Sequence, residues 1–305
     1  MEEDRKRRSA ADKIIFKKVT SPAFLRHKLK EKGLTPRRSL GQNFLVDENI
    51  LYKIISAASP APGDLVLDIG AGPGALSLAL AERGCRVIAL EKDKGLAAFL
   101  REEAKERGFD QLQIIEGDVR RLDLLETCVS LWGTPLAGKV KVVGNLPYYL
   151  TTPLLFQLLQ GDLRLELLVL MVQLEVAHRI KASPGTKDYG ALSLLCRYYT
   201  NPRLLFKVPP AVFYPPPEVN SAVVLLEVLS QPPYQVANEA LFWEIIKRAF
   251  QKRRKTLPNA LEGLNNMDKE QWKVLVNKAG LSSSCRGETL SLEQFAYLAQ
   301  ISYNN

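Results

Sequence analysis

An amide, a proline and an aromatic ring follow one another in the segment Asn145-Leu146-Pro147-Tyr148, directly after an apolar run at 140–143 that predicts a buried strand. An amide oxygen and a backbone carbonyl aimed by the fixed φ of proline can accept the two hydrogens of an aromatic amine. The nitrogen lone pair then turns toward an electrophile, and stacking on the tyrosine adds about 1–3 kcal/mol. The alternative is an ordinary turn after a strand, and these four residues alone do not separate the two interpretations.

A glycine-rich turn further upstream has the pattern of a nucleoside-binding site. Residues 65–69 predict a short buried strand, the sequence G-A-G-P-G follows at 70–74, and helical spacing begins there. Glycines such as Gly70 and Gly72 allow a tight turn and let a ligand approach backbone amides. The spacing G-x-G-x-G differs from the G-x-G-x-x-G of dinucleotide-binding turns, and it favours S-adenosylmethionine over NAD.

The next two predicted strands each lead to a carboxylate. The apolar segment 86–90 ends at Glu91, about 20 residues after the glycines, where a carboxylate suits the paired hydroxyls of a ribose. The segment 112–115 leads to Asp118, placed to accept a hydrogen bond from the adenine amine of the same cofactor. Each residue alone is more often a solvated charge, but strand ends that carry the required residue types in order predict an S-adenosylmethionine site.

From about residue 39 to its end, the chain resembles the KsgA/Dim1-type rRNA adenine dimethyltransferases, most closely the bacterial branch that acts on the small subunit. Besides the segments above, the resemblance rests on SLGQNFL at 39–45, VFYPPP at 212–217, FQKRRKTL at 250–257 and RGETLS at 286–291. The last two segments distinguish the chain from Erm-type relatives, which modify large-subunit rRNA. The resemblance implies methyl transfer from S-adenosylmethionine to two adjacent adenosines near the 3′ end of small-subunit rRNA, each methylated twice.

The resemblance also implies roles for single residues. Asn145 and the carbonyl of Leu146, aimed by Pro147, hold the target amine, and the target adenine lies between Tyr148 and Phe213. The family's cofactor residues map onto Asn43, Leu45, Gly70, Glu91, Asp118 and Asn145, to which the glycine turn adds Gly72.

Strands alternate with helical patterns through most of the chain, with a helix expected at 152–159 and strands at 165–172 and 221–227. This alternation predicts an α/β protein with a Rossmann-like, doubly wound, mostly parallel sheet and a ligand beyond the carboxyl ends of the strands. After a linker at 231–233, only helical spacing appears. We therefore expect a basic extension at 1–38 with an amphipathic helix near 22–32, a class I methyltransferase domain at 39–230, and a helical RNA-binding domain at 234–305.

The net charge of +9 is concentrated in two places. Residues 1–40 hold 13 Lys/Arg and 5 Asp/Glu, a net charge of +8. The second cluster consists of Lys247, Arg248, Lys252, Arg253, Arg254 and Lys255 and contains no acidic residue, and such cations fit a phosphate backbone. The alternatives are a solvated, disordered arm for the first and a solvated helix face for the second. We expect RNA contacts from the last four residues of the second cluster, Lys252, Arg253, Arg254 and Lys255.

Composition indicates an intracellular enzyme. No apolar run approaches the roughly 20 residues of a bilayer span, and no leader opens the chain, so we expect a cytoplasmic protein without membrane contact. The four cysteines are scattered, as expected of reduced thiols. Two histidines argue against a metal site or a histidine-based triad. The expected partner is the small ribosomal subunit with its rRNA, bound by a monomer.

Two other functions remain open. An Erm-type enzyme would use the same chemistry on large-subunit rRNA, and the C-terminal segments argue against it. A non-catalytic RNA-binding or assembly factor would keep the fold without the reaction, and the intact segment at Asn145 argues against that.

Overall fold

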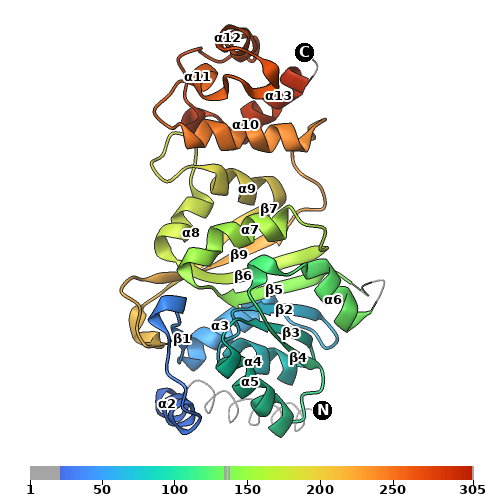
Figure 1. Cartoon of the computed structure of the whole chain (residues 1–305), viewed down its shortest axis with the longest axis vertical. Coiled ribbons are helices and arrows are strands. Elements are labelled where there is room, and N and C mark those ends of the chain that lie inside the picture. The colour runs from blue at the N-terminus through green and yellow to red at the C-terminus, as the bar shows by residue number, and fades with distance from the viewer. Residues whose placement is uncertain (1–20, 134–135, 137, 304–305) are drawn as a thin grey trace. The chain divides into compact units, whose positions relative to one another are not determined.

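A computed structural model describes residues 21–133, 136 and 138–303 (Figure 1). The chain divides into two compact units. The first runs to Ala177 and resumes from Arg203 to Val228, and the second consists of His178–Pro202 and the chain from Leu229 onward. The first half of the expected basic extension, residues 1–20, lies outside the described residues. In the described part, no helix has the length and apolar character needed to cross a bilayer.

The first unit is built on a seven-stranded sheet of order β4-β3-β2-β5-β6-β9-β7, whose strands lie side by side in Figure 1. All neighbours from β4 to β6 are parallel, and β9 is antiparallel to β6. The order reverses between β2 and β5, so the doubly wound, mostly parallel sheet is confirmed. The strands are β2 (Leu65–Ile69), β3 (Arg86–Glu91), β4 (Leu112–Glu116), β5 (Val140–Asn145), β6 (Leu165–Gln173), β7 (Thr200–Val208) and β9 (Ser221–Val228).

Helices connect these strands, and their caps explain where they begin. The helices α3, α5 and α6 each follow an aspartate, Asp47, Asp93 and Asp123, whose side chain accepts a backbone N–H of the first turn. The helix α4 instead follows Gly74, at φ 95°, and has no side-chain cap. The bounds are α3 (Glu48–Ala58), α4 (Ala75–Glu82), α5 (Lys94–Glu106), α6 (Leu124–Trp132), α7 (Thr151–Leu159) and α8 (Leu174–Lys181).

A second, two-stranded sheet joins distant parts of the first unit. The strand β1 (Phe44–Leu45) pairs antiparallel with β8 (Phe213–Tyr214). Because successive strand residues face opposite sides, the pair Leu45 and Phe213 packs into the main core, and the pair Phe44 and Tyr214 packs on the other side. The predicted amphipathic helix, α2 (Pro22–Glu31), covers that other side with Leu25 and Leu29.

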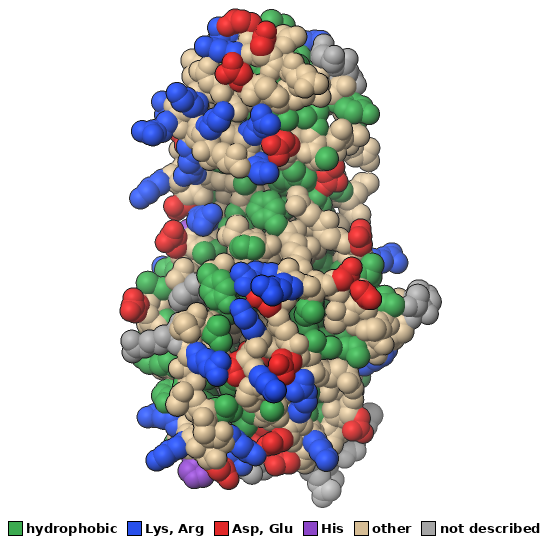
Figure 2. All heavy atoms as spheres, in the orientation of Figure 1, with side chains coloured by type: hydrophobic (Ala, Val, Ile, Leu, Met, Phe, Trp, Pro, Cys, Tyr) green, Lys and Arg blue, Asp and Glu red, His purple; other side chains and the backbone are tan. Residues whose placement is uncertain are grey.

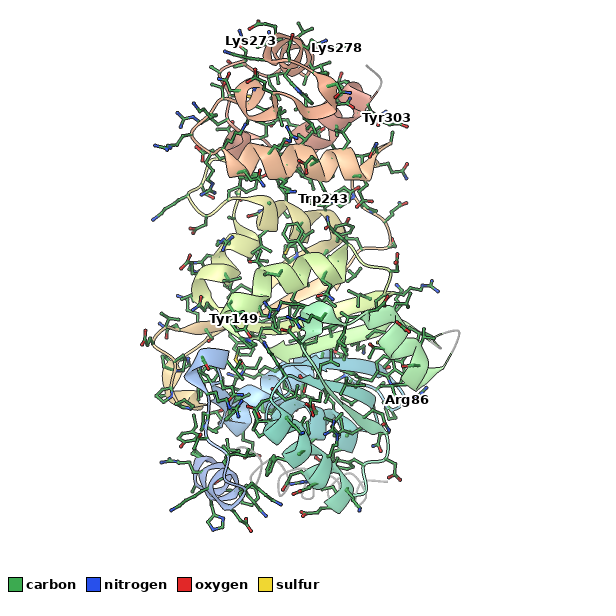
Figure 3. The ribbon with its side chains drawn as sticks, in the orientation of Figure 1. Arg86, Tyr149, Trp243, Lys273, Lys278 and Tyr303 are labelled. Atoms are coloured by element: carbon green, nitrogen blue, oxygen red, sulfur yellow. The ribbon has the colours of Figure 1, made fainter. Side chains whose placement is uncertain are left out.

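The second unit is helical, as its spacing predicts. Its core centres on buried aromatic side chains, among them Phe242, Trp272 and Phe295. The core also contains Tyr189 and Tyr198 from the segment 178–202. The sequence pattern places this segment in the first domain. The predicted domain limits, 39–230 and 234–305, therefore stay a proposal. The helices are α9 (Ala191–Tyr199), α10 (Glu239–Gln251, which carries Trp243 in Figure 3), α11 (Leu257–Leu261), α12 (Lys269–Lys278) and α13 (Leu292–Tyr303).

Candidate active site

A pocket opens at the carboxyl ends of β2, β3, β4 and β5, where a doubly wound sheet binds its ligands. It holds about 1050 Å³ of space, part of which is open solvent. Residues from six separate segments line it together. The predicted site residues in its lining are Asn43, Leu45, Gly70, Gly72, Glu91, Asp118, Asn145, Leu146, Pro147 and Phe213.

The glycine turn lets the pocket floor come close to backbone. Gly70 has φ 74° and Gly72 has φ 55°, a region that residues with a Cβ rarely adopt. A Cβ on Gly72 would lie 3.3 Å from the ring of Phe44, so the turn and β1 are in close contact. The uncapped first turn of α4 contributes Ala75 and Leu76 to the same lining, as expected of a helix start that faces a polar ligand.

Backbone N–H groups hold the carboxylate of Glu91 in place and leave it able to accept further hydrogen bonds. Its Oε2 accepts the N–H of Gly72 and its Oε1 accepts the N–H of Asp93, both at 2.7 Å. A carboxylate offers about four acceptor positions, so Glu91 keeps acceptor capacity for a ribose hydroxyl. Burial raises the pKa of Glu91, and the backbone N–H groups of Asp93, Gly72 and Lys92 oppose the rise.

Asp118, at the turn after β4, lies between two cations. Arg120 in the turn η2 (Val119–Arg121) donates its Nε at 3.0 Å and its Nη2 at 2.5 Å to the two carboxylate oxygens. Lys92 lies 3.1 Å from Oδ2. Arg120 and Lys92 hold the pKa of Asp118 well below its usual range, so the group is an anionic acceptor at neutral pH.

The amide of Asn145 is oriented by a residue far away in the sequence. Its Nδ2 donates to the carbonyl of Asn43 at 2.7 Å, and among the described residues no hydrogen bond uses its Oδ1, which can therefore accept an amine. The residue before it must be small, since a Cβ on Gly144 would lie 2.7 Å from the carbonyl oxygen of Ile69. Strand β5 therefore approaches β2 closely just before the Asn145 segment.

Aromatic and apolar side chains complete the pocket. Phe213 is buried in its wall, and Pro147 stands within 3.5 Å of a Cβ placed on Gly70. Tyr148 begins the turn η3 (Tyr148–Leu150), and its side chain lies outside the described part of the chain. Tyr149, which belongs to no predicted motif, lines the pocket and has 49% of its surface exposed. Its side chain is labelled in Figure 3. Its position next to the Asn145 segment is the signal that could have identified it.

The basic cluster of the second unit is a turn after α10. Lys252, Arg254 and Lys255 are exposed, and none of them forms an ion pair with a described residue. Arg253 differs, because its guanidinium donates to the carbonyl of Tyr189 and lies 5.9 Å from the ring of Phe250. Three of the four cations expected to bind RNA are therefore available to a phosphate, and the fourth stabilises the unit.

These features define a class of protein: an α/β protein with the Rossmann-like fold of class I methyltransferases and a pocket at the strand ends. Solved structures with this fold include a dimethyladenosine transferase from Plasmodium falciparum, with a TM-score of 0.70 over 86% of this chain and 97% of that one. The 23S rRNA methyltransferase ErmE gives a TM-score of 0.61 over 86% of this chain and all of that one. Both are 23% identical in sequence, so they show the fold alone.

Sequence comparison then gives the family. The family model for ribosomal RNA adenine dimethylases matches residues 33–300. A ribosomal RNA small subunit methyltransferase A from Pelotomaculum thermopropionicum is 47% identical over 92% of this chain and 96% of its own length. Another from Moorella thermoacetica is 45% identical over 92% and 98%. The chain therefore belongs to the ribosomal RNA adenine dimethylase family.

Proposed function

We propose that the protein dimethylates the N6 of adenines in small-subunit rRNA, with S-adenosylmethionine as methyl donor. The observation that carries the proposal is the amide of Asn145, anchored on Asn43 with Oδ1 available, at the end of β5. The neighbouring strand β2 leads into the glycine turn, where Gly72 bonds to Glu91. Family membership and the small-subunit methyltransferases at 45–47% identity support the substrate. Two adjacent adenosines near the 3′ end of that RNA, each methylated twice, are the proposed targets.

The pocket residues fit the proposed cofactor by the chemistry of their donors and acceptors. When bound, S-adenosylmethionine supplies an electrophilic methyl group on a sulfonium. Glu91 has acceptor capacity left for a ribose hydroxyl, and Gly70, Gly72, Asn43 and Leu45 shape the turn and wall around the nucleoside. Asp118 would accept the adenine amine of the cofactor, on the side of the pocket where β4 ends.

The chain's own contribution to the reaction is positioning. The Oδ1 of Asn145 and the carbonyl of Leu146 accept the target amine's hydrogens, so its lone pair leaves conjugation with the ring. Phe213 and Tyr148 hold the extruded base by stacking. The methylated amine is acidic enough to lose its proton to water, so orientation supplies the rate enhancement and no side-chain base is required.

One assay tests the proposal against its alternatives. Purified small and large ribosomal subunits without adenine dimethylation are incubated with the protein and labelled S-adenosylmethionine. We expect label in the small subunit alone, as N6,N6-dimethyladenine. Label in the large subunit would favour the Erm-type function. No label in either, despite measurable binding to small subunits, would favour a non-catalytic factor.

A further inference from the structure

The carboxylate of Asp118 has no acceptor position left. Its Oδ1 takes the backbone N–H of Arg120 at 3.2 Å and the Nε at 3.0 Å. Its Oδ2 takes the Nη2 of Arg120 at 2.5 Å and lies 3.1 Å from the Nζ of Lys92. These four contacts fill the roughly four lone-pair positions of a carboxylate. An adenine amine can therefore bind Asp118 only if one of the cations withdraws.

Arg120 is the cation that can withdraw toward a second partner. Its side chain is 43% exposed, and its Cζ lies 5.6 Å from the ring centre of Tyr149, which is itself half exposed at the pocket mouth. Figure 2 shows Lys and Arg side chains gathered, with acidic side chains among them, on the middle of the face of this unit. Because Arg120 already lies beside Tyr149, a guanidinium released from Asp118 has an aromatic neighbour at hand.

We propose that the adenine amine of the cofactor and the guanidinium of Arg120 compete for Asp118, and that the displaced guanidinium forms with Tyr149 a contact for the phosphate backbone of the RNA substrate. The inference rests on the proposed function. Guanidinium binds phosphate through two parallel hydrogen bonds, and a half-exposed tyrosine offers a stacking surface to a base beside the target. Lys92 stays with Asp118, so the carboxylate keeps a counter-charge after the exchange.

The exchange couples two binding events. An Arg120 side chain paired with Asp118 is neutralised, whereas a released one adds a positive charge to the pocket mouth. Cofactor binding should then raise the affinity for RNA. Because coupling free energies are reciprocal, RNA should raise cofactor affinity by the same factor.

The first test measures cofactor binding without RNA. Calorimetry with S-adenosylhomocysteine compares the wild type with Arg120→Gln. The glutamine amide lacks the guanidinium fork that bonds to both carboxylate oxygens of Asp118 in the wild type. The matched control is Arg121→Gln, since Arg121 is exposed in the same turn and forms no ion pair with a described residue. We expect Arg120→Gln to bind at least threefold more tightly and Arg121→Gln to stay within twofold of the wild type. Unchanged or weaker binding in Arg120→Gln would show that Arg120 supports Asp118 and does not compete for it.

The second test measures RNA binding with and without cofactor. Binding to unmethylated small subunits is measured across a salt series, with and without saturating S-adenosylhomocysteine. The wild type and Arg121→Gln should bind at least threefold more tightly with cofactor, and Arg120→Gln should lack this gain. With cofactor present, the slope of log K against log salt should fall by about 0.7–0.9 in Arg120→Gln. An equal gain in all three proteins would overturn the proposal.

A third variant separates the aromatic contact from the exchange. Tyr149→Ala should weaken binding to small subunits, while its affinity for S-adenosylhomocysteine stays within twofold of the wild type. A loss of cofactor affinity without a loss of binding to small subunits would show that Tyr149 does not contact the RNA. Thermal unfolding of every variant checks that the fold is kept. Failure of the proposed function would look different, because small subunits would then take up no label from S-adenosylmethionine, whatever the cofactor affinities of the variants.

Discussion

The Nδ2 of Asn145 donates to the carbonyl of Asn43 at 2.7 Å, across 102 positions of sequence. The bond joins the end of β5 to the segment that leads into β1, and both line the same pocket. It leaves the amide oxygen of Asn145 as the group available to a target amine. Two segments that form separate motifs in the sequence are therefore parts of one site.

Replacement of Asn145 should abolish most of the activity without unfolding the protein. Asn145→Ala removes the acceptor for the amine, and we expect the methylation rate to fall at least ~100-fold, or about 2.7 kcal/mol in the barrier. Asn145→Asp is the matched variant, because it keeps an acceptor oxygen and loses the donor to Asn43, and its rate should lie in between. Single-turnover methylation of small subunits measures both, and near-normal turnover in Asn145→Ala would contradict the assigned role.

Glu91 should decide cofactor affinity. Each charge-assisted hydrogen bond from a ribose hydroxyl is worth about 1.5–3 kcal/mol, so Glu91→Ala should bind S-adenosylhomocysteine at least ~10-fold more weakly. The control is Glu116→Ala, because Glu116 is the parallel neighbour of Glu91 in the sheet and is exposed. Calorimetry should show that only the first change weakens binding. RNA binding without cofactor should be the same in both variants.

The helix α2 should stabilise the pocket wall from behind. Leu29 is 2% exposed and packs in the cluster with Phe44, whose ring approaches Gly72. Leu29→Ala should cost about 2–3 kcal/mol of unfolding free energy, the lower part of the range for buried leucines, and should also weaken cofactor binding. Lys30→Ala on the exposed face of α2 is the control. Denaturant unfolding that does not distinguish the two variants would show that α2 does not brace the wall.

Asp68 should make stability depend on pH. It is fully buried in β2, Ser77 donates to its Oδ2 at 2.5 Å, and burial raises its pKa from 3.8 to about 7. The folded state therefore holds a proton that the unfolded state releases between these values, so this contribution to stability is complete below pH 3.8 and is lost as pH rises to about 7.

Asp68→Asn removes this titration and keeps an acceptor for Ser77. Relative to the wild type, the variant should gain at least ~1 kcal/mol of unfolding free energy at about pH 8 compared with about pH 5. Urea unfolding at the two pH values measures the difference. A constant offset between the two proteins would show that Asp68 does not titrate in this window.

The turn after α10 should bind phosphates unequally along its length. Arg254→Glu with Lys255→Glu should weaken binding to small subunits, and the salt slope should fall by about 0.7–0.9 for each phosphate that the variant no longer neutralises. Arg253→Ala should mainly lower the melting temperature, because Arg253 bonds to the carbonyl of Tyr189. Equal salt slopes for the double variant and the wild type would show that this turn is a solvated surface.

The elements and the chemistry of each strand end could be predicted from local signals in the chain. Apolar runs, the glycine turn and the residues Glu91, Asp118 and Asn145 are such signals, because a strand end and the side chain that follows it are contiguous in sequence. The alternation of strands and helices then requires these ends to meet at one edge of a parallel sheet. For this reason the pocket lining contains the predicted cofactor residues.

The partners of those residues, in contrast, follow from tertiary contacts. The bond from Asn145 to Asn43, the pairing of Leu45 with Phe213 and the ion pair of Lys92 with Asp118 depend on where separate segments meet, which no spacing encodes. The strand β7 was not predicted from the sequence, because its residues do not alternate cleanly between buried and exposed. The contribution of 178–202 to the helical core likewise follows from a chain that leaves one unit and returns, since an apolar helix face does not specify which core it will join.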